Sequence, residues 1–189
     1  MTLPFHHRRF GARGFYQPPK ALPPSGLLAS VLSECVRVRR EQGRPAVTAT
    51  LDVCRHHEQF LAADLSLVRR ALEPLVRRAF ESAAKPVAAG EVPVVPEVII
   101  TSVDVGDAIE IEVADSGPPL SDPVKMWLGE TTADRCEPSG PPEGAGLVLA
   151  AVRAATARIG GTLHATNCPD GGVAITLRLT RRQSQRQVA

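Results

Sequence analysis

Two pairs of short segments, each joined by a tight glycine turn, constrain the fold of this chain more than any other feature. In the first pair, residues 98–103 are rich in Val and Ile, residues 109–113 alternate Ile and Val with Glu, and Gly106-Asp107 lies between them. In the second pair, residues 162–167 and 172–179 are joined by Pro169-Asp170-Gly171-Gly172. Alternation with a period of two is typical of half-buried strands, and short glycine connections are typical of antiparallel hairpins. The chain is therefore predicted to contain antiparallel sheet that needs a covering layer.

Three amphipathic helices are predicted to form that layer. Apolar residues recur at three- and four-residue spacing between Gly26 and Gly43, from Asp64 to about residue 83, and from Gly144 to Ile159; this spacing places them on one helical face. Pro74 lies opposite the apolar stripe of the second helix and is expected to kink this helix or to divide it in two.

The order of these elements indicates the fold class. A strictly alternating strand at residues 47–53 lies between the first two helices, and a long loop at 116–143 precedes the third. Helices that bury their stripes against a sheet form a two-layer α/β (α+β) sandwich. We therefore expect a mixed sheet with helices on one face.

Composition separates one domain, residues 25–180, from two tails. Residues 1–24 are rich in Pro, Arg and Gly and are interpreted as a flexible basic arm, and residues 181–189 as a polar tail;. The net charge of +2 is too small to indicate a nucleic-acid partner;. No apolar run approaches the ~20 residues that span a bilayer. Four scattered cysteines are typical of a reducing compartment, so a cytoplasmic location is expected;.

Metal binding by the histidines and cysteines is not predicted. Cys54 lies near His56 and His57, but the chain has no C-x-x-C pair. Structural zinc sites usually need four well-spaced ligands. These residues are therefore not assigned as a metal site.

Two motifs have the chemistry of a nucleotide site. Asp115-Ser116-Gly117 follows the alternating strand, where a carboxylate can accept a hydrogen bond from an exocyclic amine such as that of adenine;. The same three residues are also a common turn. Gly144-Ala145-Gly146-Leu147 opens a helix whose first N–H groups can face an anion, although glycine before a helix is also a flexible joint;.

In this order, the two motifs resemble the glycine boxes of the sensor histidine kinase ATP-binding domain, which has the Bergerat fold of the GHKL ATPases. The resemblance runs from about Leu27 to Leu179, and it includes Asp64-Leu65-Ser66-Leu67-Val68, Gly160-Gly161-Thr162-Leu163 and Gly172-Val173-Ala174. It implies ATP as cofactor and a mobile lid at about residues 118–143. It also implies contact of Asp115 and Gly117 with adenine, and of Gly144, Gly146 and Leu147 with the phosphates.

The residues that depart from the family pattern affect metal binding above all. The Mg²⁺-binding Asn of the family falls at Arg78, which has five donors and no acceptor and cannot ligate a cation;. Arg78 either pairs with phosphate directly or points to solvent from a domain that has lost its nucleotide. No protein ligand for Mg²⁺ is expected. The other departures are Pro74, Glu81, Pro119, Val148 and Val173.

Three functions are compatible with this sequence. The first is a histidine kinase-like ATP-binding domain in two-component signalling, weak or inactive as a kinase and acting in trans on a partner. The partner would be a dimerisation hairpin that carries the acceptor histidine, or a response-regulator receiver domain. His6 and His7 lie in the arm and are not interpreted as phosphoacceptors. The alternatives are a non-catalytic pseudokinase interaction module and a serine kinase of the anti-sigma-factor type.

Overall fold

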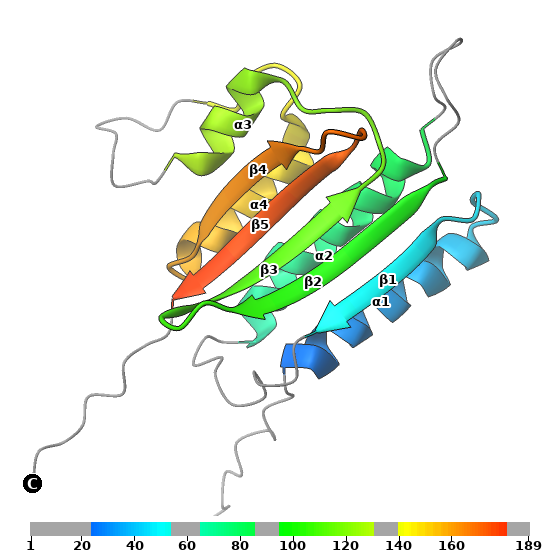
Figure 1. Ribbon diagram of the computed structural model, residues 1–189, viewed down its shortest axis with the longest axis horizontal. Coiled ribbons are helices and arrows are strands. Elements are labelled where there is room, and N and C mark those ends of the chain that lie inside the picture. Colours follow the sequence, from blue (N-terminus) through cyan, green and yellow to red (C-terminus); the bar gives the residue numbers. More distant parts are fainter. Residues whose placement is uncertain (1–23, 54–64, 86–94, 131–139, 181–189) are drawn as a thin grey trace, which may run out of the picture.

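A computed structural model describes residues 24–53, 65–85, 95–130 and 140–180. Its five strands form one sheet in the order β1-β2-β3-β5-β4 (Figure 1). β1 pairs with β2 in parallel, and the other neighbours are antiparallel. The two predicted hairpins and the mixed sheet are therefore confirmed. The strands are β1 (Thr48–Val53), β2 (Glu97–Asp104), β3 (Ala108–Asp115), β4 (Thr162–Asn167) and β5 (Val173–Thr180).

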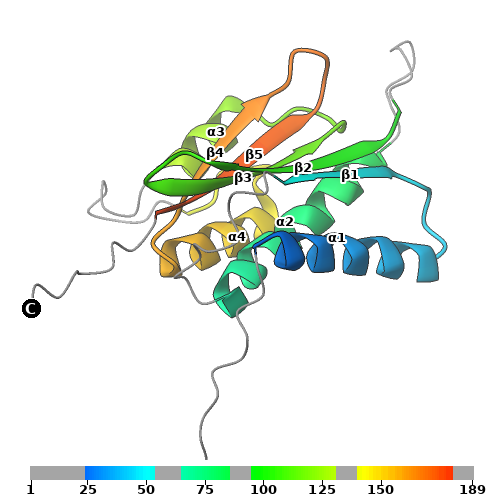
Figure 2. The same cartoon turned by 60° about the horizontal axis from the view of Figure 1, so that its bottom comes forward.

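Helices α1 (Pro24–Glu41), α2 (Leu65–Ala83) and α4 (Gly146–Arg158) cover one face of the sheet, as Figure 2 shows. The central helix α2 contacts both α1 and α4 as well as β2 and β3. Its buried side chains recur at helical spacing, which orients the whole apolar stripe toward the sheet;. The predicted two-layer sandwich is confirmed.

Helix α2 is one helix through Pro74. Its division in two, one of the expected effects of this proline, does not occur. The ring lies on the half-buried side of the helix, away from the buried stripe that holds Leu72 and Val76 against the core. The missing N–H therefore costs one hydrogen bond at the helix surface and leaves the packing of the core intact.

The region 116–143 holds more structure than its sequence suggested. Helix α3 (Asp122–Gly129) forms within it and lies beside the edge strand β4 (Figure 1). Val124, Trp127 and Leu128 are buried, and the Arg153 guanidinium of α4 stacks 4.6 Å from the Trp127 ring centre. The prediction of an unstructured stretch is therefore wrong for these residues. The helix was not predicted because its apolar stripe has only three residues and its flanks are rich in proline and glycine.

Several predictions concern segments outside the described residues. These are the N-terminal arm up to residue 23, the Asp64 helix cap, the Cys54–His57 segment and the tail 181–189. In the described ranges, no helix is long and apolar enough to cross a membrane.

Candidate functional site

A pocket of about 290 Å³ lies where the C-terminal part of α2, the segment after β3 and the start of α4 meet. It contains four of the six predicted site residues, namely Arg78, Gly144, Gly146 and Leu147. Its other lining residues are Ser82, Lys85, Pro118, Pro119, Leu120, Ala145, Val148 and Leu149. Residues from three distant segments thus converge on one cavity.

The start of α4 requires its two glycines. Gly144 has a φ of +89° and Gly146 a φ of +66°, a left-handed backbone that L side chains rarely adopt;. Ala145 occupies the N-cap position and no side chain caps the helix. Within the part of the chain that the structure describes, no side chain accepts from the first N–H groups of α4, so these groups are available to an anion in the pocket;.

Asp115 lies directly behind the pocket wall. Its side chain is only 1% exposed, and one carboxylate oxygen, Oδ2, accepts a 2.9 Å hydrogen bond from Arg78 Nη1. The other oxygen, Oδ1, accepts the Gly117 N–H at 2.9 Å, and the Ser82 hydroxyl also bonds this carboxylate. Asp115 is thus satisfied entirely by groups of its own chain.

Arg78 is the partner that closes this arrangement. Its side chain is 16% exposed, and its guanidinium reaches from α2 to the end of β3. The interpretation in which Arg78 points to solvent is therefore wrong, because the side chain bonds Asp115. Burial raises the pKa of the Asp115 carboxyl, while the nearby Arg78 charge and the donors from Gly117 and Ser82 act in the opposite direction;.

Gly117 is held against the backbone of α2. A Cβ at this position would lie 2.5 Å from the carbonyl carbon and oxygen of Ser82, and it would also overlap the Ser82 hydroxyl oxygen. Only glycine permits this approach. The neighbouring Ser116 fixes the turn, because its hydroxyl accepts the Glu97 N–H at 2.9 Å.

The segment that follows Gly117 is anchored to the other hairpin. The Asn167 side chain accepts the Leu120 N–H and donates to the Leu120 carbonyl, both at 2.9 Å. Asn167 is the last residue of β4, so the segment 118–120 is tied to the sheet at the pocket mouth. This amide anchor fixes one wall of the cavity.

Comparison with known proteins places this geometry in a family. Residues 63–183 match the histidine kinase-, DNA gyrase B- and HSP90-like ATPase family. The chain belongs to this family. A search of curated proteins found no match.

Solved structures share the fold at low sequence identity. The catalytic domain of histidine kinase ThkA is 18% identical, with a TM-score of 0.62 over 85% of this chain and 94% of that domain. ShkA, solved full-length with AMPPNP, is 20% identical, with a TM-score of 0.61 over 85% of this chain and 30% of its own. The mycobacterial sensor kinase MprB is 20% identical, with a TM-score of 0.54 over 82% of this chain and 96% of that one.

The pocket of this family member does not fit a Mg²⁺ ion. Its described lining residues include no carboxylate or side-chain amide, the oxygen donors that a hard cation prefers;. Arg78 falls where the sequence resemblance expects the family's Asn, and its guanidinium is a donor only. Asp115 is both buried and paired, so it cannot replace the missing ligand.

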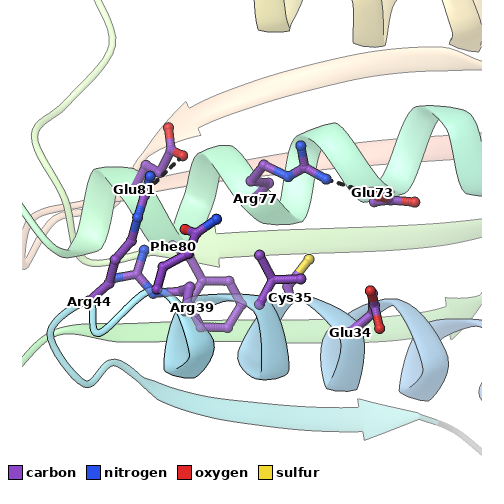
Figure 3. A pocket seen from close by; sticks show the side chains of 10 residues that line it. Glu34, Cys35, Arg39, Arg44, Glu73, Arg77, Phe80 and Glu81 are labelled. Atoms are coloured by element: carbon purple, nitrogen blue, oxygen red, sulfur yellow. Dashed lines mark hydrogen bonds and ion pairs between the residues drawn. The ribbon is translucent and has the colours of Figure 1, made fainter.

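A second pocket, of about 240 Å³, lies on the opposite side of α2, against α1 (Figure 3). Here Arg77 pairs with Glu73 at 3.0 Å, and Arg44 pairs with Glu81 at 3.1 Å. Glu81, which stands where the family has Lys, therefore does not face the candidate nucleotide pocket. Arg77 and Arg78 are adjacent in sequence but line different pockets.

Sequence reasoning missed three contributors to the site. Ser82 follows Arg78 by four residues and so lies on the same helical face, a spacing that could have identified it. Lys85 and Asn167 gave no such signal. Their roles depend on how α2 ends and on which loop faces the end of β4.

Proposed function

We propose that this chain is a histidine kinase-like nucleotide-binding domain in two-component signalling that transfers phosphate weakly or not at all and acts in trans on a partner. The fold and the converging glycine segments support the nucleotide-binding part of this function. The Arg78–Asp115 ion pair, at 2.9 Å, supports the loss of kinase activity. The ion pair engages the Asp115 carboxylate, which would otherwise bind adenine, and it places Arg78 at the position that would ligate the metal.

Phosphoryl transfer normally depends on Mg²⁺ to bridge the phosphates and to neutralise the charge that develops on them. When bound in an active relative, the ion supplies this neutralisation. In this chain the start of α4 and Lys85 can bind and orient an anion, but the described lining of the pocket offers no carboxylate or side-chain amide oxygen to a metal.

An apolar patch at the pocket, formed by its lining residues Leu147 and Val148, supports action on a partner. Leu147 is 87% exposed and Val148 43% exposed, both in the first turn of α4. Contiguous exposed apolar surface can mark a site of protein contact. ThkA has been solved in complex with the response regulator TrrA, and it aligns with 87% of this chain at 16% identity and a TM-score of 0.59. A receiver domain or a histidine-bearing helical hairpin is therefore the proposed partner.

A phosphotransfer assay tests this function. The protein would be incubated with γ-labelled ATP, Mg²⁺ and either a histidine-bearing hairpin or a receiver domain, beside an active histidine kinase. Because Mg²⁺ has no protein ligand, we expect transfer about 100-fold slower than the active kinase, or none. Transfer at the rate of the active kinase would contradict the proposal, and acid-stable label on serine would favour the serine kinase alternative.

Capture of the partner distinguishes a nucleotide-dependent module from a pseudokinase. If the domain acts only by binding, retention of hairpin or receiver on immobilised protein should be unchanged by ATP. Leu147→Glu places a charge in the apolar patch and should abolish retention. Met126→Glu, at another exposed apolar residue, on α3, is the matched control. Equal effects of both substitutions would count against the α4 patch.

A further inference from the structure

Arg78 changes the hydrogen-bonding character of the candidate nucleotide pocket. Among the described lining residues, the charged side chains are Arg78 and Lys85, both donors, and the uncapped N–H groups of α4 are donors as well;. In the residues described, the guanidinium has one carboxylate partner, through Nη1, while it also forms part of the pocket wall. The pocket therefore presents mainly donors to a ligand.

Asp115, the group that would select adenine, is closed to a ligand by its burial and its ion pair. Its two oxygens accept from Arg78, Gly117 and Ser82, and its side chain is 1% exposed. An exocyclic amine could bond this carboxylate only after the Arg78 side chain had left it. Breaking such a buried ion pair is costly, because it leaves one charge desolvated and unpaired.

We propose that Arg78 sets the ligand specificity of this pocket, so that it binds metal-free polyphosphate and does not discriminate between nucleobases. This rests on the proposed function, because it takes the pocket to be the nucleotide site. The acceptors that match the available donors are phosphate oxygens. Mg²⁺ bound to a polyphosphate removes part of its negative charge and receives no protein ligand in return, so it weakens the attraction.

Titration calorimetry on the full chain tests this specificity. ATP, GTP and inorganic tripolyphosphate would each be titrated in EDTA and again in excess Mg²⁺. We expect the three dissociation constants in EDTA to agree within about threefold. Excess Mg²⁺ should lower the affinity for each ligand by about threefold or more. ATP binding about tenfold tighter than GTP, or binding strengthened by Mg²⁺, would overturn the proposal.

Two variants connect the result to Arg78. Arg78→Lys retains a cation beside Asp115 and should likewise not discriminate ATP from GTP, whereas Arg78→Asn frees Asp115 and should prefer ATP over GTP by about tenfold. Arg77→Asn makes the same change at the adjacent residue, which is 61% exposed and faces the other pocket, and should alter nothing. If Arg78→Asn does not fold, the titrations of the wild type and of Arg78→Lys still test the proposed specificity.

The outcomes also separate this inference from the proposed function. Selective, Mg²⁺-dependent ATP binding by the wild type would overturn the specificity of Arg78 and leave nucleotide binding in place. No heat with any of the three ligands would overturn both the specificity and nucleotide binding. Retention of the partner would then be the part of the proposed function that still stands.

Discussion

Gly172→Ala is expected to lower the free energy of unfolding by about 3–5 kcal/mol, from left-handed backbone strain together with overpacking. Gly172 has a φ of +96°, and the Asp115 carbonyl oxygen occupies the place where a Cβ would be, with its carbonyl carbon 3.0 Å away. These are backbone atoms, which cannot rotate away as a side chain would. The end of β3 must move to accommodate the methyl group.

The adjacent glycine provides a matched control. Gly171 has a φ of +94°, but a Cβ there would meet nothing within 4 Å. Gly171→Ala should therefore show only the backbone strain, about 1–2 kcal/mol. Urea unfolding of both variants measures the difference. Equal losses would show that the contact of Gly172 with the Asp115 backbone does not constrain the site.

The second large effect is expected at the ion pair. Removing one partner of a buried pair leaves an uncompensated charge, so Arg78→Ala should cost about 3–5 kcal/mol of unfolding free energy. Replacing both residues, as in Arg78→Ala with Asp115→Ala, should cost clearly less than the sum of the single changes. A double-mutant cycle by urea unfolding should give a coupling energy of about 1–3 kcal/mol. A coupling near zero would show that the pair does not form in solution.

The pH dependence of Arg78→Ala follows from the Asp115 carboxyl. Burial already raises the pKa of Asp115 in the folded protein, and removal of Arg78 takes away a charge that lowers this pKa;. A folded-state carboxyl pKa above the unfolded value means that stability falls as pH rises through that interval. The penalty of Arg78→Ala should therefore be largest at neutral pH and should shrink as the pH falls below the raised pKa.

Much of the fold could be predicted because its signals are periodic. The alternation at residues 109–113 and 172–179 predicted two hairpins, and the stripe of α2 predicted a helix that packs on the sheet. Helix α3 was missed because its stripe is short and its flanks are rich in Pro and Gly. Its burial comes from β4 and from stacking on Arg153, contacts that no local pattern encodes.

The candidate site was only partly predictable, for a different reason. Resemblance to known motifs located Asp115, Gly144 and Gly146, since each lies at a recognisable position relative to a strand or helix end. It could not show that Arg78 reaches Asp115, because a long side chain at the border of the core has several directions open to it. Which one it takes depends on the burial of Asp115 and on the space left beside Ser82.

Calorimetry of Mg²⁺–ATP binding to Arg78→Asn and to the wild type tests most directly whether the Arg78–Asp115 ion pair closes the nucleotide site. This substitution places an amide oxygen where the family resemblance expects the metal ligand, and it frees the Asp115 carboxylate from its ion pair. If the ion pair is what closes the family's nucleotide site, affinity should rise about tenfold or more, and the rise should require Mg²⁺. Unchanged affinity in a folded variant, or wild-type binding already as tight, would contradict it.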